Sequence, residues 1–122
     1  MSKVLIIDDS NEVRQEVKGV LASSNHVLLE ASTGEEALKI AEDDTINLFI
    51  IDYHMPGING LEVSIRLRKS QKYSNTPIIM FTTESGDKMI ETGRSLGRLW
   101  WIVKPMNEPS FVGAVKRVLE LS

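Results

Sequence analysis

The chain has 122 residues, of which 42% are hydrophobic and 25% are charged, which fits one globular domain with a full core and excludes a disordered or collagen-like chain. Its 14 Lys and Arg against 17 Asp and Glu give a formal net charge of −3, so there is no global attraction to nucleic acid or to an anionic membrane. The chain has no Cys and two His, which excludes disulfides, thiol catalysis and Cys-ligated metal centres and disfavours a His-rich zinc site.

Five short apolar segments predict the strands of the fold. Each is rich in β-branched or aromatic residues and is apolar at consecutive positions, as in strands that are buried on both faces of a parallel sheet. None approaches the roughly 20 apolar residues of a transmembrane helix, so we expect a cytoplasmic protein without membrane insertion. The segments are Val4–Ile7, Val27–Leu29, Ile46–Ile51, Pro77–Phe81 and Leu99–Val103.

Helical periodicity fills the intervals between these segments. Apolar residues recur on one helical face, as Val13, Val17 and Val20 do in the first interval. The fourth helix, expected over residues 85–96, is predicted to be weak, because it contains two Gly and an interior Gly costs roughly 1 kcal/mol relative to Ala. The side chains expected to cap helices at their N-termini are Ser10, Thr33, Asn59 and Asn107.

Five strands alternating with five helices predict a doubly wound α/β fold of the (βα)5 type with a five-stranded parallel sheet. Right-handed crossovers place helices on both faces of such a sheet, and ligands bind at the carboxyl ends of its strands. Polar side chains stand at these ends, and we expect them to meet at one edge. They are Asp8, Asp9, Asp52, Thr82 and Lys104.

The cluster of Asp8, Asp9 and Asp52 predicts a metal-dependent site for phosphoryl transfer. Three adjacent carboxylates raise each other's pKa unless a cation joins them. Carboxylate oxygens at a shallow site suit Mg²⁺, which keeps several of its waters. A divalent cation, an ammonium group and a hydroxyl around one carboxylate stabilise a transferring phosphoryl group, with the carboxylate oxygen as nucleophile. The product would be a reactive, short-lived acyl phosphate.

The sequence resembles the receiver domains of two-component response regulators, and most closely the single-domain regulators of chemotaxis. The matching segments are VLIIDDS at residues 4–10, DYHMPGING at residues 52–60, Thr82, and WIVKP at residues 101–105. They follow the order and spacing of the family over the whole chain. The resemblance implies a flavodoxin-like fold and a single receiver domain that spans residues 1–122.

The resemblance makes Asp52 the phosphoacceptor. The phosphodonor would be a histidine kinase or a phosphotransfer protein, or a small molecule such as acetyl phosphate. The resemblance also implies that Asp8, Asp9 and Asp52 hold Mg²⁺ together with the main-chain carbonyl of His54. Because the reaction modifies the protein itself, we expect no enzyme, although the chain would assist its own phosphorylation and dephosphorylation.

Residues on the other strands also take roles by resemblance. Thr82 would bond a phosphoryl oxygen, Lys104 would pair with the phosphoryl charge, and the Lys104–Pro105 peptide would be cis. His54 and Glu84 occupy positions that tune dephosphorylation in the family. By resemblance, the His54 side chain would overhang the phosphoryl group.

Trp101 stands where the family usually has Tyr or Phe as an aromatic switch. Trp100 adds a second indole, and strand alternation directs the two rings to opposite faces of the sheet. We expect a phosphoryl group to draw Thr82 in and to let the Trp101 ring turn inward, which is a shift between accessible conformers. The surface of the fourth helix, fifth strand and fifth helix would then bind a downstream protein. Asn59 replaces the usual Asp, and both cap a helix.

These features predict a phosphoacceptor response regulator that acts in chemotaxis and flagellar motor control. The chain ends soon after the fifth helix, so we expect no output domain and no direct binding of nucleic acid. A phosphorelay intermediate, or another single-domain receiver, is the alternative. A more remote one is an aspartyl-phosphate hydrolase of the haloacid dehalogenase type, whose second Asp falls where this chain has Ser10. A flavin site is disfavoured, because acidic residues after the first strand would repel its phosphate.

Overall fold

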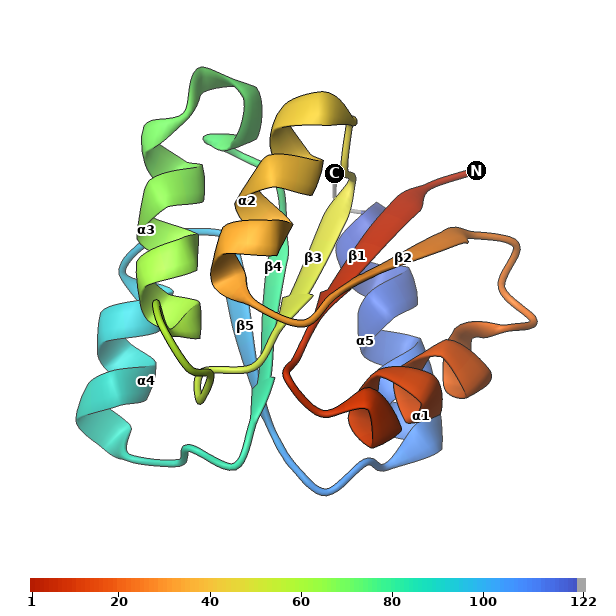
Figure 1. Cartoon of the computed structure of the whole chain (residues 1–122). Coiled ribbons are helices and arrows are strands. Elements are labelled where there is room, and N and C mark those ends of the chain that lie inside the picture. Colours follow the sequence, from red (N-terminus) through yellow and green to blue (C-terminus); the bar gives the residue numbers. More distant parts are fainter. Residues whose placement is uncertain (121–122) are drawn as a thin grey trace.

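Five strands form one parallel sheet in this structure, a computed structural model that describes residues 1–120. The strands are β1 (Lys3–Ile7), β2 (Val27–Ala31), β3 (Leu48–Ile51), β4 (Ile78–Thr82) and β5 (Leu99–Val103). Their order across the sheet is β2-β1-β3-β4-β5 (Figure 1). Because every neighbouring pair is parallel, the carboxyl ends of all strands lie at the same edge.

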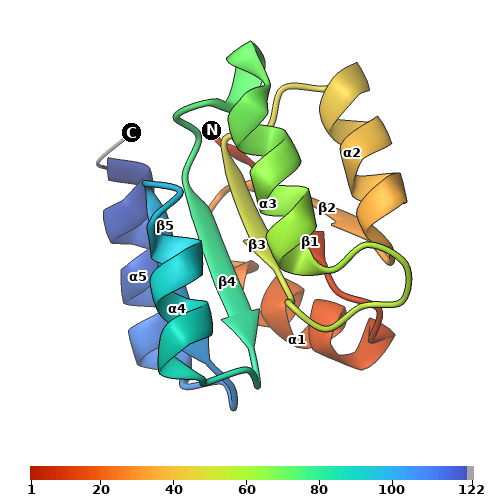
Figure 2. The same cartoon turned by 90° about the vertical axis from the view of Figure 1, so that its left-hand side faces the viewer.

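Five α-helices within the described residues connect the strands and cover both faces of the sheet. They are α1 (Asn11–Leu21), α2 (Gly34–Asp43), α3 (Gly60–Lys69), α4 (Asp87–Arg94) and α5 (Glu108–Glu120). Helices α1 and α5 lie on one face, and α2, α3 and α4 lie on the other (Figures 1 and 2). A short 3₁₀ helix, Gln71–Tyr73, precedes β4. The predicted doubly wound (βα)5 fold is confirmed.

The sheet divides the core into two layers. Phe49 and Trp101 belong to the layer under α2, α3 and α4, whereas Phe81, Phe111 and Trp100 belong to the layer under α1 and α5. The two indoles therefore point to opposite faces, as strand alternation predicts. All residues of β3 and β4 are buried, which explains their uninterrupted apolar sequence. In the part of the chain that the structure describes, no helix has the length and hydropathy needed to cross a membrane.

Helix α4 is shorter than predicted, because it covers Asp87–Arg94 rather than residues 85–96. Gly86 occupies its N-cap position and offers no side chain to accept a hydrogen bond. Beyond its other end the chain turns at Gly97, with φ at 77°. The guanidinium of Arg68 on α3 donates to the Gly97 carbonyl oxygen, with Nη2 and O 2.8 Å apart. The helix thus starts without a side-chain cap, and an arginine from α3 holds the turn that follows it.

Side chains cap the four other helices at the predicted positions. The capping oxygens belong to Ser10, Thr33, Asn59 and Asn107, and each accepts a hydrogen bond from the main-chain N–H three residues further on. Asn59 bears most directly on the functional edge, because α3 begins just after the loop that follows β3. Its Oδ1 lies 2.9 Å from the main-chain nitrogen of Glu62.

Replacing Asn59 with Ala is expected to lower the free energy of unfolding by about 1 kcal/mol, because α3 loses its capping oxygen. Asn59→Asp is the matched control. Its carboxylate accepts the same hydrogen bond and is favourably placed at a helix N-terminus, so it should keep or raise the stability. Urea unfolding followed by circular dichroism measures both variants. Equal stability of Asn59→Ala and wild type would contradict the capping role.

Candidate functional site

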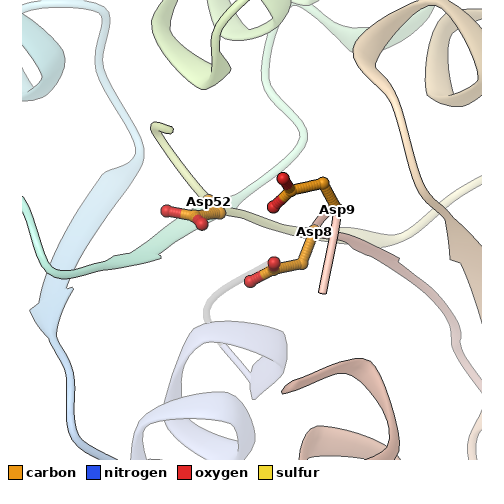
Figure 3. A group of neighbouring side chains, drawn as sticks. All are labelled: Asp8, Asp9 and Asp52. Atoms are coloured by element: carbon orange, nitrogen blue, oxygen red, sulfur yellow. The ribbon is translucent and has the colours of Figure 1, made fainter. Parts of the chain in front are cut away.

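Three carboxylates gather at the edge where β1 and β3 end (Figure 3). Asp8 and Asp9 follow β1, and Asp52 follows β3, which pairs directly with β1. One oxygen from each side chain lies within 4.8 Å of the others. Asp8 and Asp52 are buried, whereas Asp9 is exposed. The parallel pairing of β1 and β3 therefore brings together residues that are 43 or more positions apart in the sequence.

One ammonium group faces this cluster. Lys104 follows β5, and its side chain is only 16% exposed. Its Nζ lies 3.1 Å from Asp8 Oδ2 and 3.5 Å from Asp52 Oδ2. The peptide bond between Lys104 and Pro105 is cis. One positive charge thus faces three carboxylates, so the cluster keeps an excess of negative charge when all three are ionised.

The titration of Asp8 reflects this crowding. Burial raises the pKa of Asp8 above its ordinary value, and the negative charge of Asp52 raises it further. A hydrogen bond from the Ser10 N–H and the contact with Lys104 lower the pKa but do not cancel the effect of burial. The protein therefore disfavours the charged form of Asp8, and an additional cation at the cluster would offset that cost.

The loop after β3 holds Asp52 in place. The main-chain N–H of His54 donates to Asp52 Oδ1 over 3.2 Å. The N–H of Gly60 donates to the carbonyl oxygen of Tyr53 over 3.0 Å, which closes the loop at the start of α3. Position 60 requires glycine, because a Cβ there would overlap the main-chain oxygen of Asp52. Helix α3 thus begins in direct contact with the Asp52 backbone.

Thr82 and Glu84 approach the same edge from β4. Thr82 is fully buried, and its Oγ1 accepts a hydrogen bond from the main-chain N–H of Glu84 over 3.2 Å. The Glu84 carboxylate faces the imidazole of His54, with Oε1 and Nε2 3.5 Å apart. The two side chains, 27% and 54% exposed, meet from the loops after β4 and β3. The pair that the sequence associates with dephosphorylation therefore forms one contact.

The indole of Trp101 is buried beneath α4. Its Nε1 donates to the main-chain oxygen of Glu84 over 2.8 Å. A Cβ added at Gly93 would lie 2.7 Å from Cζ3 of the ring, which is too close for any real contact. Gly93 thus leaves a notch in α4 that the indole fills, and we call it the Gly93 notch. Trp101 is thus buried, with only 8% of its surface exposed.

A cavity of about 510 Å³ opens beside the carboxylates, lined by Asp9, residues 53–57 and Asn59. A larger cavity of about 820 Å³ lies at the opposite edge of the sheet, because segments that precede β3, β4 and β5 line it. Among the described residues, no carboxylate side chain lines the larger cavity. Since doubly wound folds bind ligands at the carboxyl ends of their strands, the smaller cavity is the one that serves the site.

The donor set at this edge fits a hard divalent cation. The carboxylate oxygens are hard ligands, the buried negative charge is only partly balanced, and the exposed Asp9 leaves one side open to water. A buried hydroxyl and an ammonium group supply the other contacts that stabilise a phosphoryl group during transfer. Fold and site together define a phosphoacceptor domain built on a doubly wound α/β sheet.

The family model of the response regulator receiver domain matches residues 4–116, and the chain belongs to this family. A protein of Campylobacter jejuni, a homologue of the chemotaxis protein CheY, is 38% identical over 105 residues. These residues cover 84% of this chain and 81% of that relative. The chain is a phosphoacceptor response regulator of two-component signalling.

Two solved structures show the same architecture. Chemotaxis protein CheY4 of Vibrio cholerae superposes with a TM-score of 0.90 and is 35% identical, with 97% of this chain and 98% of that chain covered. Response regulator TrrA of Thermotoga maritima, in complex with Mg²⁺ and BeF, has a TM-score of 0.85 and 31% identity. That match covers 97% of this chain and 99% of TrrA.

Every side chain that the sequence marks for chemistry lies at or beside this edge: Asp8, Asp9, Asp52, His54, Thr82, Glu84, Trp101 and Lys104. The structure adds two residues that shape the site and that the sequence did not mark for chemistry. Arg14 on α1 donates a hydrogen bond to the main-chain oxygen of Asp8, and no sequence motif predicts that contact. Gly93 had a signal, because two Gly in one short helix are unusual, but that signal indicated only a weak helix.

Asp8→Asn is expected to raise the melting temperature at pH 7 in the absence of divalent cations, because it removes a charge that the folded state disfavours. A raised folded-state pKa means that the wild type loses stability as the pH rises from the unfolded-state pKa through the folded-state pKa. The advantage of the variant should therefore disappear below about pH 3.5. Thermal unfolding in EDTA between about pH 3.5 and pH 7 measures the difference in melting temperature between the variant and the wild type. An advantage that is absent at pH 7 or grows toward acid would contradict the raised pKa.

Proposed function

We propose that Asp52 is the phosphoacceptor of this response regulator. The observation that carries the proposal is the position of the Lys104 ammonium, 3.5 Å from Asp52 Oδ2, beside the carboxylates of Asp8 and Asp9. An oxygen of Asp52 attacks the phosphorus of a phosphohistidine on a kinase or phosphotransfer protein. The P–N bond breaks, and the imidazole leaves with the electron pair. Acetyl phosphate reacts in the same way, with a P–O bond breaking and acetate leaving.

We assign the cation of the site to Mg²⁺, held by Asp8, Asp9 and Asp52 with the main-chain carbonyl of His54. The preference of Mg²⁺ for hard oxygen ligands and for retained waters supports this assignment, because Asp9 is exposed. When bound, the cation would neutralise charge on the transferring phosphoryl group and assist the protein's own phosphorylation. Lys104 would supply positive charge from the side of β5.

We propose that Thr82 and Lys104 then hold the phosphoryl group. The Thr82 hydroxyl accepts a hydrogen bond from the Glu84 N–H and keeps its own proton to donate to a phosphoryl oxygen. Lys104 would exchange part of its contact with Asp8 for the phosphoryl charge. His54 and Glu84, whose side chains meet, would control how water reaches the phosphorus and so set the lifetime of the acyl phosphate.

We propose that the downstream protein binds the face formed by α4, β5 and α5. Strand β5 is at the edge of the sheet, and Figure 2 shows α4 and α5 on either side of it. Trp101 on β5 connects this face with the site, because its Nε1 bonds the main chain of Glu84, two residues after Thr82. Movement of Thr82 toward a phosphoryl group would adjust the segment that holds the ring. We assign the buried ring, seated in the Gly93 notch, to the form that binds the partner.

We place this regulator in chemotaxis, with the flagellar motor as the target. The similarity to the chemotaxis proteins of C. jejuni and V. cholerae supports this pathway. It favours chemotaxis over a role as a phosphorelay intermediate. The aspartyl-phosphate hydrolase has no support at the residue it requires, because position 10 is Ser and caps α1.

Incubation with acetyl phosphate and Mg²⁺ is expected to add one phosphoryl group to the wild type, and Asp52→Asn should abolish this addition. Intact-mass spectrometry measures the product. Asp9→Ala serves as a second variant that keeps the acceptor and should label more slowly, because a cation ligand is lost. Undiminished labelling of Asp52→Asn would place the acceptor elsewhere.

Gly93→Ala is expected to lower the melting temperature, because the new Cβ meets the Trp101 ring, although Ala ordinarily favours a helix by about 1 kcal/mol. We also expect beryllofluoride with Mg²⁺, a mimic of the phosphoryl group, to change the Trp emission of the wild type, and Gly93→Ala should weaken this change. The matched control is Gly113→Ala on α5, where a Cβ meets no atom within 4 Å, and this variant should gain stability.

The Trp101→Phe background tests whether Gly93→Ala acts through the Trp101 ring or through helix α4 alone. Phe has a smaller ring without Cζ3, the atom nearest to the new Cβ, so Gly93→Ala should cost less stability there or raise it. Thermal unfolding of the four proteins in this cycle measures the coupling between the two positions. An equal loss of stability in both backgrounds would show that the notch does not seat the ring.

A further inference from the structure

The side chain of Arg14 on α1 bonds the peptide unit that joins two of the three carboxylate residues. Its Nη1 donates to the main-chain oxygen of Asp8 over 2.6 Å. A peptide unit is planar, so fixing the Asp8 oxygen also fixes the plane that contains the Asp9 nitrogen. Arg14 therefore limits the directions in which the Asp9 side chain can leave the backbone.

The guanidinium is itself held at every nitrogen. Besides the bond to Asp8, its Nε donates to Glu30 Oε1 over 2.9 Å, and its Nη2 donates to Asn11 Oδ1 over 3.2 Å. The Arg14 side chain is only 13% exposed. Glu30 on β2 also accepts hydrogen bonds from Lys18 and Gln15 of α1. Contacts with Lys18 and Arg14 hold the pKa of Glu30 below its ordinary value, so this anchor is ionised at neutral pH.

Asp8 and Asp9 differ in how they are held. The Asp8 carboxylate accepts hydrogen bonds from the Ser10 N–H and from Lys104. The Asp9 carboxylate is exposed, and within residues 1–120 it makes no hydrogen bond or ion pair. Its place beside Asp8 and Asp52 is thus set by the backbone alone, which is where Arg14 acts.

We propose that Arg14, oriented by Glu30, is a positioning residue for the cation site. It holds the Asp8–Asp9 peptide so that the Asp9 carboxylate stays within reach of Asp8 and Asp52. The proposal rests on the cation site proposed above, and Arg14 does not touch the cation. Its positive charge alone would have the opposite effect, because a cation near the carboxylates weakens the binding of another cation.

Positioning by Arg14 would raise the affinity for Mg²⁺, whereas its positive charge alone would lower it, so removing Arg14 distinguishes the two. Arg14→Gln removes the charge and shortens the side chain. If Arg14 positions Asp9, the dissociation constant for Mg²⁺ should rise about tenfold, as when a group that orients a metal ligand is lost. If Arg14 acts only as a charge, Mg²⁺ should bind more tightly. Isothermal titration calorimetry with Mg²⁺ and the unphosphorylated full chain measures the constant without using phosphorylation as the readout.

Three further variants sharpen the result. Lys18→Gln is the matched control, because it removes a positive charge from the same Glu30 but leaves the Asp8 contact, so Mg²⁺ affinity should stay equal or increase. Arg14→Lys keeps the charge but loses the planar fork, and it should weaken binding as Arg14→Gln does. Glu30→Gln removes the anchor and should weaken binding less. Thermal unfolding in EDTA identifies any variant that is not folded, and Arg14→Lys is the variant best placed to stay folded.

The titrations distinguish a failure of the Mg²⁺ site from a failure of the positioning role of Arg14. Asp9→Ala should abolish most of the Mg²⁺ binding. If the wild type binds no Mg²⁺, the cation site is wrong and the positioning role is wrong with it. If the wild type binds Mg²⁺ and Asp9→Ala does not, but folded Arg14→Gln binds as tightly as wild type or more tightly, only the positioning role is overturned.

Discussion

Repulsion among three carboxylates at one sheet edge is the constraint on which this molecule depends. The pairing of β1 with β3 forces Asp8, Asp9 and Asp52 together, and burial of two of them strengthens the repulsion, because screening by water is reduced. Lys104 reaches them from β5, the outer strand on the far side of β4, and balances only part of the charge. A divalent cation would offset the remaining excess of negative charge, and this excess is the physical basis of the proposed Mg²⁺ site.

Contacts run from this edge to the surface through a few residues. Thr82 is bonded to the backbone of Glu84, the carbonyl of Glu84 is bonded to Trp101, and the indole fills the space that Gly93 leaves in α4. In the proposed switch, these contacts would be made in one state and broken in the other. In the proposed switch, a change at Thr82 would move α4 more easily than a capped helix, because α4 starts without a side-chain cap.

The sequence allowed the strands to be predicted because the sheet buries both faces of β3 and β4, which leaves uninterrupted apolar runs. The third strand begins later than predicted, at Leu48 instead of Ile46, because a side chain replaces the main-chain partner there. Ile46 is buried but precedes β3, since its N–H bonds the hydroxyl of Tyr73. The convergence of Asp8 and Asp52 followed from parallel topology alone and needed no knowledge of side-chain packing.

Arg14 and Gly93 illustrate what the sequence could not provide. The contact of Arg14 joins a helix side chain to a main-chain oxygen, so it depends on how α1 sits against β1 and leaves no pattern of residue types. Gly93 could be read as a helix breaker, but only the packed structure shows the ring that occupies its missing side chain. Such contacts arise from the orientation of whole elements, which periodicity and capping do not determine.

The separation of the buried edge from the outer helix surfaces has a consequence for how such molecules diversify. Lys88 and Glu91 on the outer side of α4 are exposed, and no contact ties them to the carboxylates. Such positions can change without disturbing the chemistry at the sheet edge. After gene duplication, such proteins can therefore gain new binding partners while the reaction at the sheet edge stays the same. One cell can then contain many separate signalling pathways whose regulators have the same core and site but different outer surfaces.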